Sequence, residues 1–462
     1  CLIGLCIFGI RGRTGYNPIK VSAAYFCQDA FLNQLGVSPT FNLLTSVMDD
    51  MRPENKYLHL MDEQEAITKA QALLNRPGDA NVSPLAVYRR AAKADSVQQR
   101  RPNVVLIMME SMSAEFMKHF GQSETLTPFL DSLYTRSISF RNFYSAGIHT
   151  NHGLYATLYS FPAMMKRNLM KGSVIPRYSG LPTVLKENGY YNLFFMTHEG
   201  QYDNMNAFFR TNGYDEVFSQ EDYPADKVVN SFGVQDDFLY DYAIPVLNQR
   251  AATGQPFFAT LLSISNHPPY VIPPFFHPKT SEPETQIVEY ADWALRQFFE
   301  EARKQPWFDN TIFVLEGDHG KLVGDAECEL PESYNHIPLM IYSSRIQPEE
   351  KTTFGGQVDI QPTILGLLNI DYLQNNFGVD LLKEERPCMF YMVVGRNDTL
   401  LYLYNYETQQ ELTYDIGNGK LNAVPMDDSF LPLKEYSFSM LQSAEFLVKH
   451  GKTLNSIPFT QQ

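Results

Sequence analysis

The stretch Asn103–Met109 (NVVLIMM) decides the fold of this chain. It is an almost continuous apolar run with β-branched residues, and it ends abruptly at the polar segment Glu110–Ser113 (ESMS). An apolar run followed at once by a polar loop or helix start is typical of a parallel strand that is buried on both faces. We therefore predict a central strand over 103–109 that presents Glu110 at its carboxyl end.

The same alternation of helical segments, apolar runs and polar loops recurs along the chain. The predicted strands are Tyr191–Met196, Pro256–Ser265 and Thr311–Leu315, and the predicted helices are Leu181–Asn188 and Thr285–Lys304. Repeated strand–loop–helix units predict an α/β fold with a doubly wound, mostly parallel sheet flanked by helices.

Each predicted strand is followed by residues whose side chains can bind a metal ion or take part in catalysis. These residues are Glu110, His198, His267, Asp318 and His319. In open α/β sheets the ligand site lies at the carboxyl ends of the strands, so we expect these five side chains to meet on one rim.

The sequence before and after this pattern predicts two further parts of the protein. Gln64–Asn75 has helical composition and Asp398–Tyr406 looks like a strand of a mostly antiparallel sheet, while Met440–His450 looks like a closing helix. We predict three parts: an N-terminal helical arm over 1–101, a catalytic domain over 102–390 and a small C-terminal accessory subdomain over 391–462.

The first residues of the chain leave three interpretations open. Cys1–Ile10 is uniformly apolar and then meets Arg11 and Arg13. A membrane-spanning helix needs about 20 apolar residues, so this run is too short to span by itself. It is an internal strand, the last turns of a transmembrane helix, or a lipid-modified N-terminal cysteine; the third is weaker, because a polar tether usually follows such a cysteine.

Composition excludes several classes of protein. The 462 residues include 37 Lys and Arg against 52 Asp and Glu, a net charge of −15, which argues against a nucleic-acid partner. A hydrophobic content of 44 % and an aromatic content of 13 % argue against disorder. The five cysteines form no CxxC pair, so neither a zinc knuckle, a thioredoxin-type motif nor a disulfide scaffold is expected.

The predicted rim contains the ligands of a divalent metal ion. Asp318 and His319 offer a carboxylate and an imidazole from adjacent residues, and Glu110 offers a second carboxylate. The loop Ser145–Leu154 supplies hydroxyls, and Thr150 stands where that loop enters a helix. Taken alone, Thr150 is most often a helix N-cap, but a hydroxyl at a helix start can also attack an anion held there.

Several dispersed blocks resemble the lipoteichoic acid synthase branch of the sulfatase and alkaline phosphatase superfamily. Thr150 lies where that branch places its threonine nucleophile. The resembling blocks, in the expected order, are the opening strand Pro102–Ser111, the "TP-x-L-D-x-L" helix Leu126–Leu133, the metal-binding Asp-His in Gly317–Gly320, the "VD-x-x-PT-x-L" helix Val358–Leu365 and the "G-x-D-L-L" segment Gly378–Leu382.

The resemblance implies a role for each site residue. Glu110, Thr150, Asp318 and His319 would bind one divalent ion, with Mn²⁺ expected and Zn²⁺ or Mg²⁺ as alternatives. Thr150 would attack the phosphorus of a phospholipid headgroup and form a phospho-threonine, and His267 would protonate the leaving oxygen. We assign His198, His267, His152, Asn151 and His336 to substrate binding; a hydrogen-bonded structural histidine is the alternative for His152 and His336.

The expected activity is transfer of a phosphoglycerol- or phosphoethanolamine-type group from a phospholipid to a glycan or lipid of the cell envelope. The resemblance also implies an inner or plasma membrane protein, anchored by preceding helices, with a periplasmic or extracellular catalytic domain, and it favours the transmembrane-helix interpretation of Cys1–Ile10. A phosphodiesterase or sulfatase that uses water, and an inactive envelope protein that binds lipid or glycan, are the alternatives.

Two departures from the family pattern matter. The Cys/Ser-x-Pro-x-Arg signature of true sulfatases is missing, which counts against a formylglycine sulfatase. The Trp and Arg that bind glycerol phosphate in lipoteichoic acid synthases are also missing, and Asp203 and Met205 align there. The second departure leaves the headgroup open.

Overall fold

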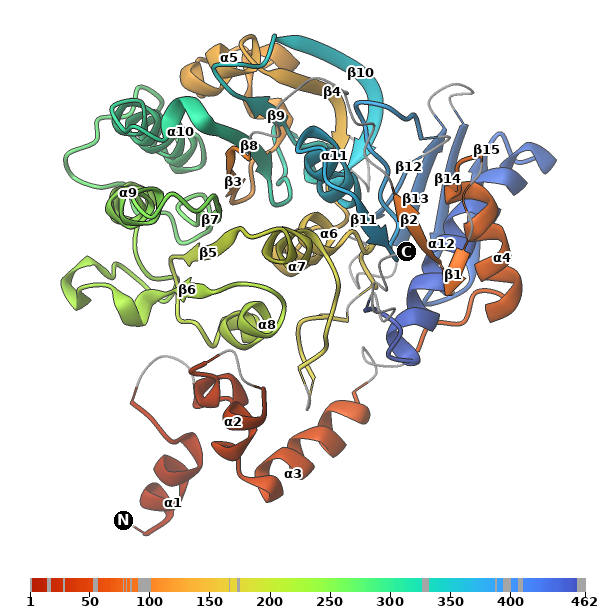
Figure 1. The fold of residues 1–462 in the computed structure, drawn as a ribbon, viewed down its shortest axis with the longest axis horizontal. Helices are drawn as coiled ribbons and strands as arrows, with labels where there is room; N and C mark the ends of the chain where they lie inside the picture. The colour runs from red at the N-terminus through yellow and green to blue at the C-terminus, as the bar shows by residue number, and fades with distance from the viewer. Residues whose placement is uncertain are drawn as a thin grey trace.

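The computed structural model describes residues 2–14, 18–27, 30–52, 57–77, 79, 81–83, 85–89, 101–165, 167–172, 175–325, 332–386, 389–393, 400–405 and 410–454. An eight-stranded sheet forms its centre, in the order β10–β4–β9–β8–β3–β7–β5–β6 (Figure 1). Its strands are β3 (Asn103–Met109), β4 (Ile138–Tyr144), β5 (Tyr191–Met196), β6 (Glu216–Phe218), β7 (Phe257–Leu262), β8 (Thr311–Gly317), β9 (Leu339–Tyr342) and β10 (Glu349–Gly356). Neighbouring strands are parallel except at β9, which pairs antiparallel with β4 and β8, so the predicted mostly parallel sheet is confirmed.

Strand β3 divides two hydrophobic cores because its side chains alternate between the two faces of the sheet. Val104, Leu106 and Met108 face one core, and Val105 and Ile107 face the other; all five are fully buried. The first core is covered by α6 (Thr150–Tyr159), α7 (Leu181–Glu187), α8 (Met205–Thr211) and α11 (Ile360–Leu367). The second is covered by α5 (Pro128–Tyr134), α9 (Asp236–Ala251) and α10 (Pro283–Ala302), which makes the sheet doubly wound as predicted.

The predicted strands differ from the observed ones mainly at their ends. β7 stops at Leu262 instead of continuing to Ser265, because the backbone N–H groups of Ile264 and Ser265 turn to the carboxylate of Asp236 at 2.8 and 3.0 Å. β8 continues to Gly317, since its last residues keep pairing with β3.

The N-terminal region is helical, as expected of an arm. Its helices are α1 (Leu2–Arg11), α2 (Ala30–Leu35), α3 (Pro39–Asp50) and α4 (Glu63–Leu74). Because Leu2–Arg11 is a helix, the internal-strand interpretation of Cys1–Ile10 is wrong, and Cys1 itself lies outside the described residues. Within the described part of the chain, no helix combines the length and apolar character that crossing a membrane requires.

The two smaller sheets lie beside the central domain. β2 (Ala86–Arg89) pairs with β1 (Asn81–Ser83) on one side and with β11 (Tyr372–Gln374) on the other, so the predicted arm shares a sheet with a late segment of the predicted catalytic domain. The antiparallel sheet is built from β12 (Met389–Val393), β13 (Leu400–Asn405), β14 (Gln410–Asp415) and β15 (Lys420–Val424). α12 (Leu431–Lys449) starts earlier than the predicted helix 440–450 and packs along α4 (Figure 1).

Candidate active site

Two neighbouring strands bring the predicted metal ligands together. Met109 at the end of β3 pairs with Gly317 at the end of β8, so the next residues, Glu110 and Asp318, stand side by side. His319 follows directly. One ligand atom from each of Glu110, Asp318 and His319 lies within 4.8 Å of the others. The sheet therefore assembles three of the four predicted metal-binding residues.

The carboxylates of Glu110 and Asp318 are buried, and in each of them only one of the two oxygens accepts a hydrogen bond from the described residues. Asp318 Oδ1 accepts hydrogen bonds from the backbone N–H groups of Ser111 (2.8 Å) and His319 (2.7 Å), and Glu110 Oε1 accepts one from the Ser111 hydroxyl (2.6 Å). Glu110 Oε2 and Asp318 Oδ2 are buried with no hydrogen-bond partner among the described residues. Burial, together with the charge of Asp318, raises the pKa of Glu110 well above its ordinary range. Since buried acceptors without partners are costly, these two oxygens fit a bound cation.

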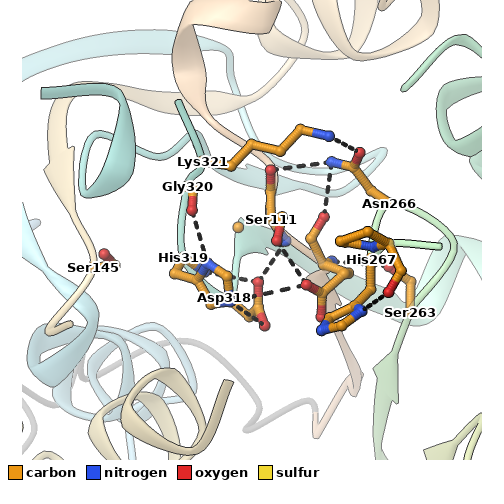
Figure 2. A network of polar contacts seen from close by, with 12 residues as sticks. Ser111, Ser145, Ser263, Asn266, His267, Asp318, His319, Gly320 and Lys321 are labelled. Atoms are coloured by element: carbon orange, nitrogen blue, oxygen red, sulfur yellow. Dashed lines mark hydrogen bonds and ion pairs between the residues drawn. The ribbon is translucent and has the colours of Figure 1, made fainter. Parts of the chain in front are cut away.

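His319 is oriented for the same ion. Its Nδ1 lies 2.8 Å from the carbonyl oxygen of Gly320, so Nδ1–H donates there and Nε2 is left to face the acids. Nε2 lies 3.6 Å from Asp318 Oδ2 and 3.9 Å from Glu110 Oε1 (Figure 2). A backbone carbonyl that fixes the tautomer in this way is the usual support of a metal-binding histidine.

Helix α6 directs Thr150 toward the cluster. Thr150, Gly153 and Thr157 are three and four residues apart, so they share one face of the helix. Thr157 Oγ1 donates to Glu316 Oε1 at 2.6 Å, and Gly153 lies against the backbone carbonyl of Asp318. This face of α6 therefore lies along β8, with Thr157 at Glu316 and Gly153 at Asp318. Thr150 lies one helical turn further in the same direction, and its side chain is half-buried.

The close approach of α6 to β8 predicts the effect of Gly153→Ala. A Cβ at Gly153 would lie 2.3 Å from the Asp318 carbonyl oxygen, so the helix must move away. Displacing a reacting group by about 1 Å costs about 100-fold in rate, and we expect a loss of turnover of that order. Alanine is the better helix former, by about 1 kcal/mol, so an unfolded helix would not explain the loss. Turnover and the midpoint of thermal unfolding check this together; unchanged turnover would contradict the packing described.

Gln357 is a buried residue of the site that the sequence did not single out. Its Nε2 donates to the carbonyl oxygens of Gly317 (3.1 Å) and Asp318 (2.8 Å), and its Oε1 accepts from the Ala146 N–H at 2.9 Å. One side chain thus ties the loop that leads into Thr150 to the end of β8. Its position just before the Val358–Leu365 block was the only available signal.

The end of β7 contributes a polar bridge over the cluster. Asn266 Nδ2 donates to the backbone oxygens of Glu110 and Ser111, both at 3.1 Å, and its Oδ1 accepts from Lys321 Nζ at 2.5 Å (Figure 2). Lys321 also lies 3.2 Å from the Tyr270 hydroxyl. Burial lowers the pKa of Lys321 to about 8, so this lysine belongs to the site region and is not an ordinary solvated side chain.

The two candidate pocket histidines are joined by aromatic rings. His267 packs on Phe232 with 4.1 Å between ring centroids, and His198 packs on Tyr202 at 4.7 Å; Tyr202 and Phe232 are 6.3 Å apart. His267 Nδ1 lies 2.6 Å from the Pro268 carbonyl oxygen, which leaves Nε2 available. Burial lowers the pKa of both histidines. Neither aromatic residue was singled out from the sequence, because a lone aromatic in a loop carries no local signal.

The remaining predicted pocket residues lie in different settings. Asn151 is half-buried, and its Nδ2 lies 3.4 Å from Asp203 Oδ2, while its buried Oδ1 has no partner in the described part of the chain. His152 is buried, with its ring against the backbone of Gly147. His336 lies apart from the cluster: Nδ1 pairs with Glu115 Oε1 at 2.9 Å and Nε2 with the Arg141 carbonyl oxygen at 2.8 Å. With both nitrogens engaged, His336 has the setting of a structural histidine.

Comparisons with known proteins point to a family. A family model described as Sulfatase matches residues 102–370. The chain is 24 % identical over 315 residues to lipoteichoic acid synthase 2 of Bacillus subtilis (strain 168), covering 61 % of this chain and 47 % of that protein. It is 25 % identical over 346 residues to lipoteichoic acid synthase 1 of the same organism, covering 69 % and 53 %. The chain therefore spans about half the length of these curated relatives.

Two solved structures are similar in fold. A protein in the alkaline phosphatase superfamily from Vibrio parahaemolyticus superposes with a TM-score of 0.72 at 27 % identity, covering 86 % of this chain and 98 % of that chain. The lipoteichoic acid synthase LtaP from Listeria monocytogenes superposes with a TM-score of 0.61 at 22 % identity, covering 79 % and 94 %. At that lower identity the likeness shows the fold alone.

Proposed function

The chain belongs to the sulfatase family, and from that premise we propose that it is a metal-dependent transferase. It moves a phosphoglycerol- or phosphoethanolamine-type group from a phospholipid to a glycan or lipid of the cell envelope through a phospho-threonine. The observation that carries the proposal is the buried cluster of Glu110, Asp318 and His319 beside the helix that begins at Thr150, with two carboxylate oxygens that have no hydrogen-bond partner among the residues described. Similarity to lipoteichoic acid synthases supports the class of reaction.

The first half-reaction forms the covalent intermediate. Glu110, Asp318, His319 and the Thr150 hydroxyl would hold one divalent ion, of which Mn²⁺ is the expected one. When bound, the ion would lower the pKa of the hydroxyl and polarise the phosphoryl oxygens. Thr150 Oγ gives its proton to solvent water and forms a bond to phosphorus, while the bond between phosphorus and the diacylglycerol oxygen breaks. His267, whose Nδ1 is occupied by the Pro268 carbonyl, protonates the leaving oxygen from Nε2.

The second half-reaction releases the headgroup to its acceptor. An acceptor hydroxyl gives its proton to His267 Nε2 and bonds to phosphorus, and the bond between phosphorus and Thr150 Oγ breaks. Thr150 Oγ takes a proton back from solvent water, so the chain returns to its starting state. Because the product of the donor leaves the site before the acceptor binds there, we expect ping-pong kinetics.

The headgroup pocket of this chain differs from the family pattern at Asp203. Asp203 pairs with Lys171 at 2.6 Å and lies beside Asn151, where the pattern places a phosphate-binding residue. The unpartnered Oδ1 of Asn151 accepts a hydrogen bond from a headgroup hydroxyl or ammonium. Both candidate headgroups supply such a donor, so we retain both in the proposal. We assign His198 and His152 to the same pocket.

One experiment separates transfer from hydrolysis. We expect the purified chain with Mn²⁺ to move a radiolabelled headgroup from phosphatidylglycerol or phosphatidylethanolamine to added envelope glycan or glycolipid. Labelled free headgroup phosphate as the sole product, with acceptor present, would overturn transfer and favour a hydrolase. A chain that binds no Mn²⁺ and releases no label would be an inactive binding protein.

A further inference from the structure

Helix α3 exposes a row of large apolar side chains. The exposed fractions are 65 % for Leu43, 60 % for Leu44, 50 % for Val47 and 63 % for Met48. Phe41 is 42 % exposed. Soluble surfaces carry single apolar residues of this kind, whereas a contiguous group marks a binding surface.

The exposed side chains form one continuous face of the helix. At about 100° per residue, these five residues fall within an arc of about 160°. The half-buried polar residues Asn42, Thr45 and Ser46 fall on the opposite side. The helix therefore turns its polar side toward the rest of the protein and its apolar side outward. A helix that packs on a protein core does the reverse.

The neighbouring helices also expose large apolar side chains. Figure 1 places α1, α2 and α3 together on one side of the molecule, beyond α8. In α1, Leu2 and Ile3 are each 77 % exposed, and in α2 Leu35 is 68 % exposed. Over residues 1–57 there are five Lys and Arg against four Asp and Glu, whereas the remaining residues carry a net charge of −16 within the total of −15. An apolar surface on a part of the chain that lacks the strong negative charge of the rest is compatible with an anionic lipid surface.

The same region contacts the segment that follows His198. Arg13 pairs with Glu199 at 2.8 Å, the Lys20 N–H donates to Gln201 Oε1 at 3.2 Å, and Asn206 Nδ2 donates to the Tyr25 carbonyl oxygen at 2.9 Å. A lipid surface covering α3 would therefore lie next to the candidate headgroup pocket.

We infer that the outward apolar face of α3, formed by Phe41, Leu43, Leu44, Val47 and Met48, lies flat in the headgroup region of a membrane that contains anionic lipids. α3 is then an in-plane lipid-binding helix that holds the pocket against the bilayer. This surface is separate from the chemical step, so it is tested without turnover, and a failure of the proposed transfer leaves it standing.

The test compares two double variants in co-sedimentation with vesicles of phosphatidylglycerol and phosphatidylethanolamine. Leu44→Ser/Met48→Ser removes two side chains from the α3 face. Val424→Ser/Met426→Ser removes two side chains of similar exposure, 66 % and 60 %, from the C-terminal sheet region as a matched control. We expect the α3 variant to bind vesicles at least about tenfold more weakly than the unchanged chain, and the control to bind equally.

Two results would overturn the inference. One is equal vesicle binding by the α3 variant and the unchanged chain. The other is a dimer of the unchanged chain in light scattering that the α3 variant loses, without vesicle binding by either, because a second copy would then be the partner of this face. Circular dichroism of both variants confirms that the exposed substitutions leave the fold intact.

Discussion

Thr150→Ala is expected to abolish turnover and every trace of a covalent phospho-adduct. In the proposed mechanism Thr150 is the nucleophile, and without its hydroxyl the proposed site has no atom to take the phosphoryl group. Loss of a covalent nucleophile typically leaves only the small acceleration that binding and electrostatics supply. We expect turnover of labelled phospholipid to fall by at least about 10⁴-fold.

The matched variant for this experiment is Thr150→Ser. Serine keeps the hydroxyl and the helix start, so it should retain measurable turnover and a phospho-serine adduct. Because the side chain is half-buried at the first position of α6, neither change should lower stability strongly. Unreduced turnover in Thr150→Ala would remove the residue from the mechanism.

Asp318→Asn is expected to remove metal binding while keeping the fold. The Oδ1 atom of asparagine can still accept from the Ser111 and His319 N–H groups, as Asp318 Oδ1 does at 2.8 and 2.7 Å. What disappears is the negative charge and the oxygen Oδ2, which is buried without a hydrogen-bond partner among the described residues. Replacing even an outer partner of a metal ligand costs 10- to 100-fold in affinity, so we expect Mn²⁺ affinity to fall by at least about 100-fold.

Glu316→Gln supplies the matched control for Asp318→Asn. Glu316 lies two residues earlier on the same strand, and burial raises its pKa well above the ordinary range. Glutamine keeps the shape of the side chain, and its Oε1 can still accept from Thr157. Titration calorimetry with Mn²⁺ should show control binding close to that of the unchanged chain. Equal Mn²⁺ affinity in Asp318→Asn would contradict the assigned site.

The sheet was largely predictable from the sequence because its strands are buried on both faces. Such strands appear as uninterrupted apolar runs, and Tyr191–Met196 matches β5 at both ends. Their order in the sheet was not predictable, since the contact of β3 with β8 joins segments about 200 residues apart. The predicted resemblance to the sulfatase family and its lipoteichoic acid synthase branch is confirmed by the matched family model and the curated relatives.

The candidate site was predictable where residues directly follow strands, and less so elsewhere. Glu110, Asp318 and His319 come together because β3 and β8 are neighbours. His336 lies at the same edge of the sheet, bridged to Tyr144 at the end of β4, but its ring nitrogens bond to Glu115 and Arg141. Apart from its place just before the Val358–Leu365 block, Gln357 gave no signal, because its role depends on three backbone groups from two distant segments.

The start of the chain shows that a short apolar run does not decide between a helix and a strand. Helix and strand both bury apolar residues, and Cys1–Ile10 is too short for its period to separate them. The structure makes Leu2–Arg11 helical, but the membrane-helix interpretation stays a prediction. α3 was not singled out, since its polar and apolar residues alternate at the ordinary helical spacing and only the structure shows which side faces outward.

The central claim is that Thr150 carries the phosphoryl group, and peptide mapping by mass spectrometry tests it most directly. The chain is loaded with Mn²⁺, mixed with phospholipid in the absence of acceptor, quenched and digested. We predict that the headgroup phosphate mass lies on Thr150 of the peptide spanning α6, and that it disappears when acceptor is added. An adduct on another residue, or turnover that proceeds with none, would contradict the claim.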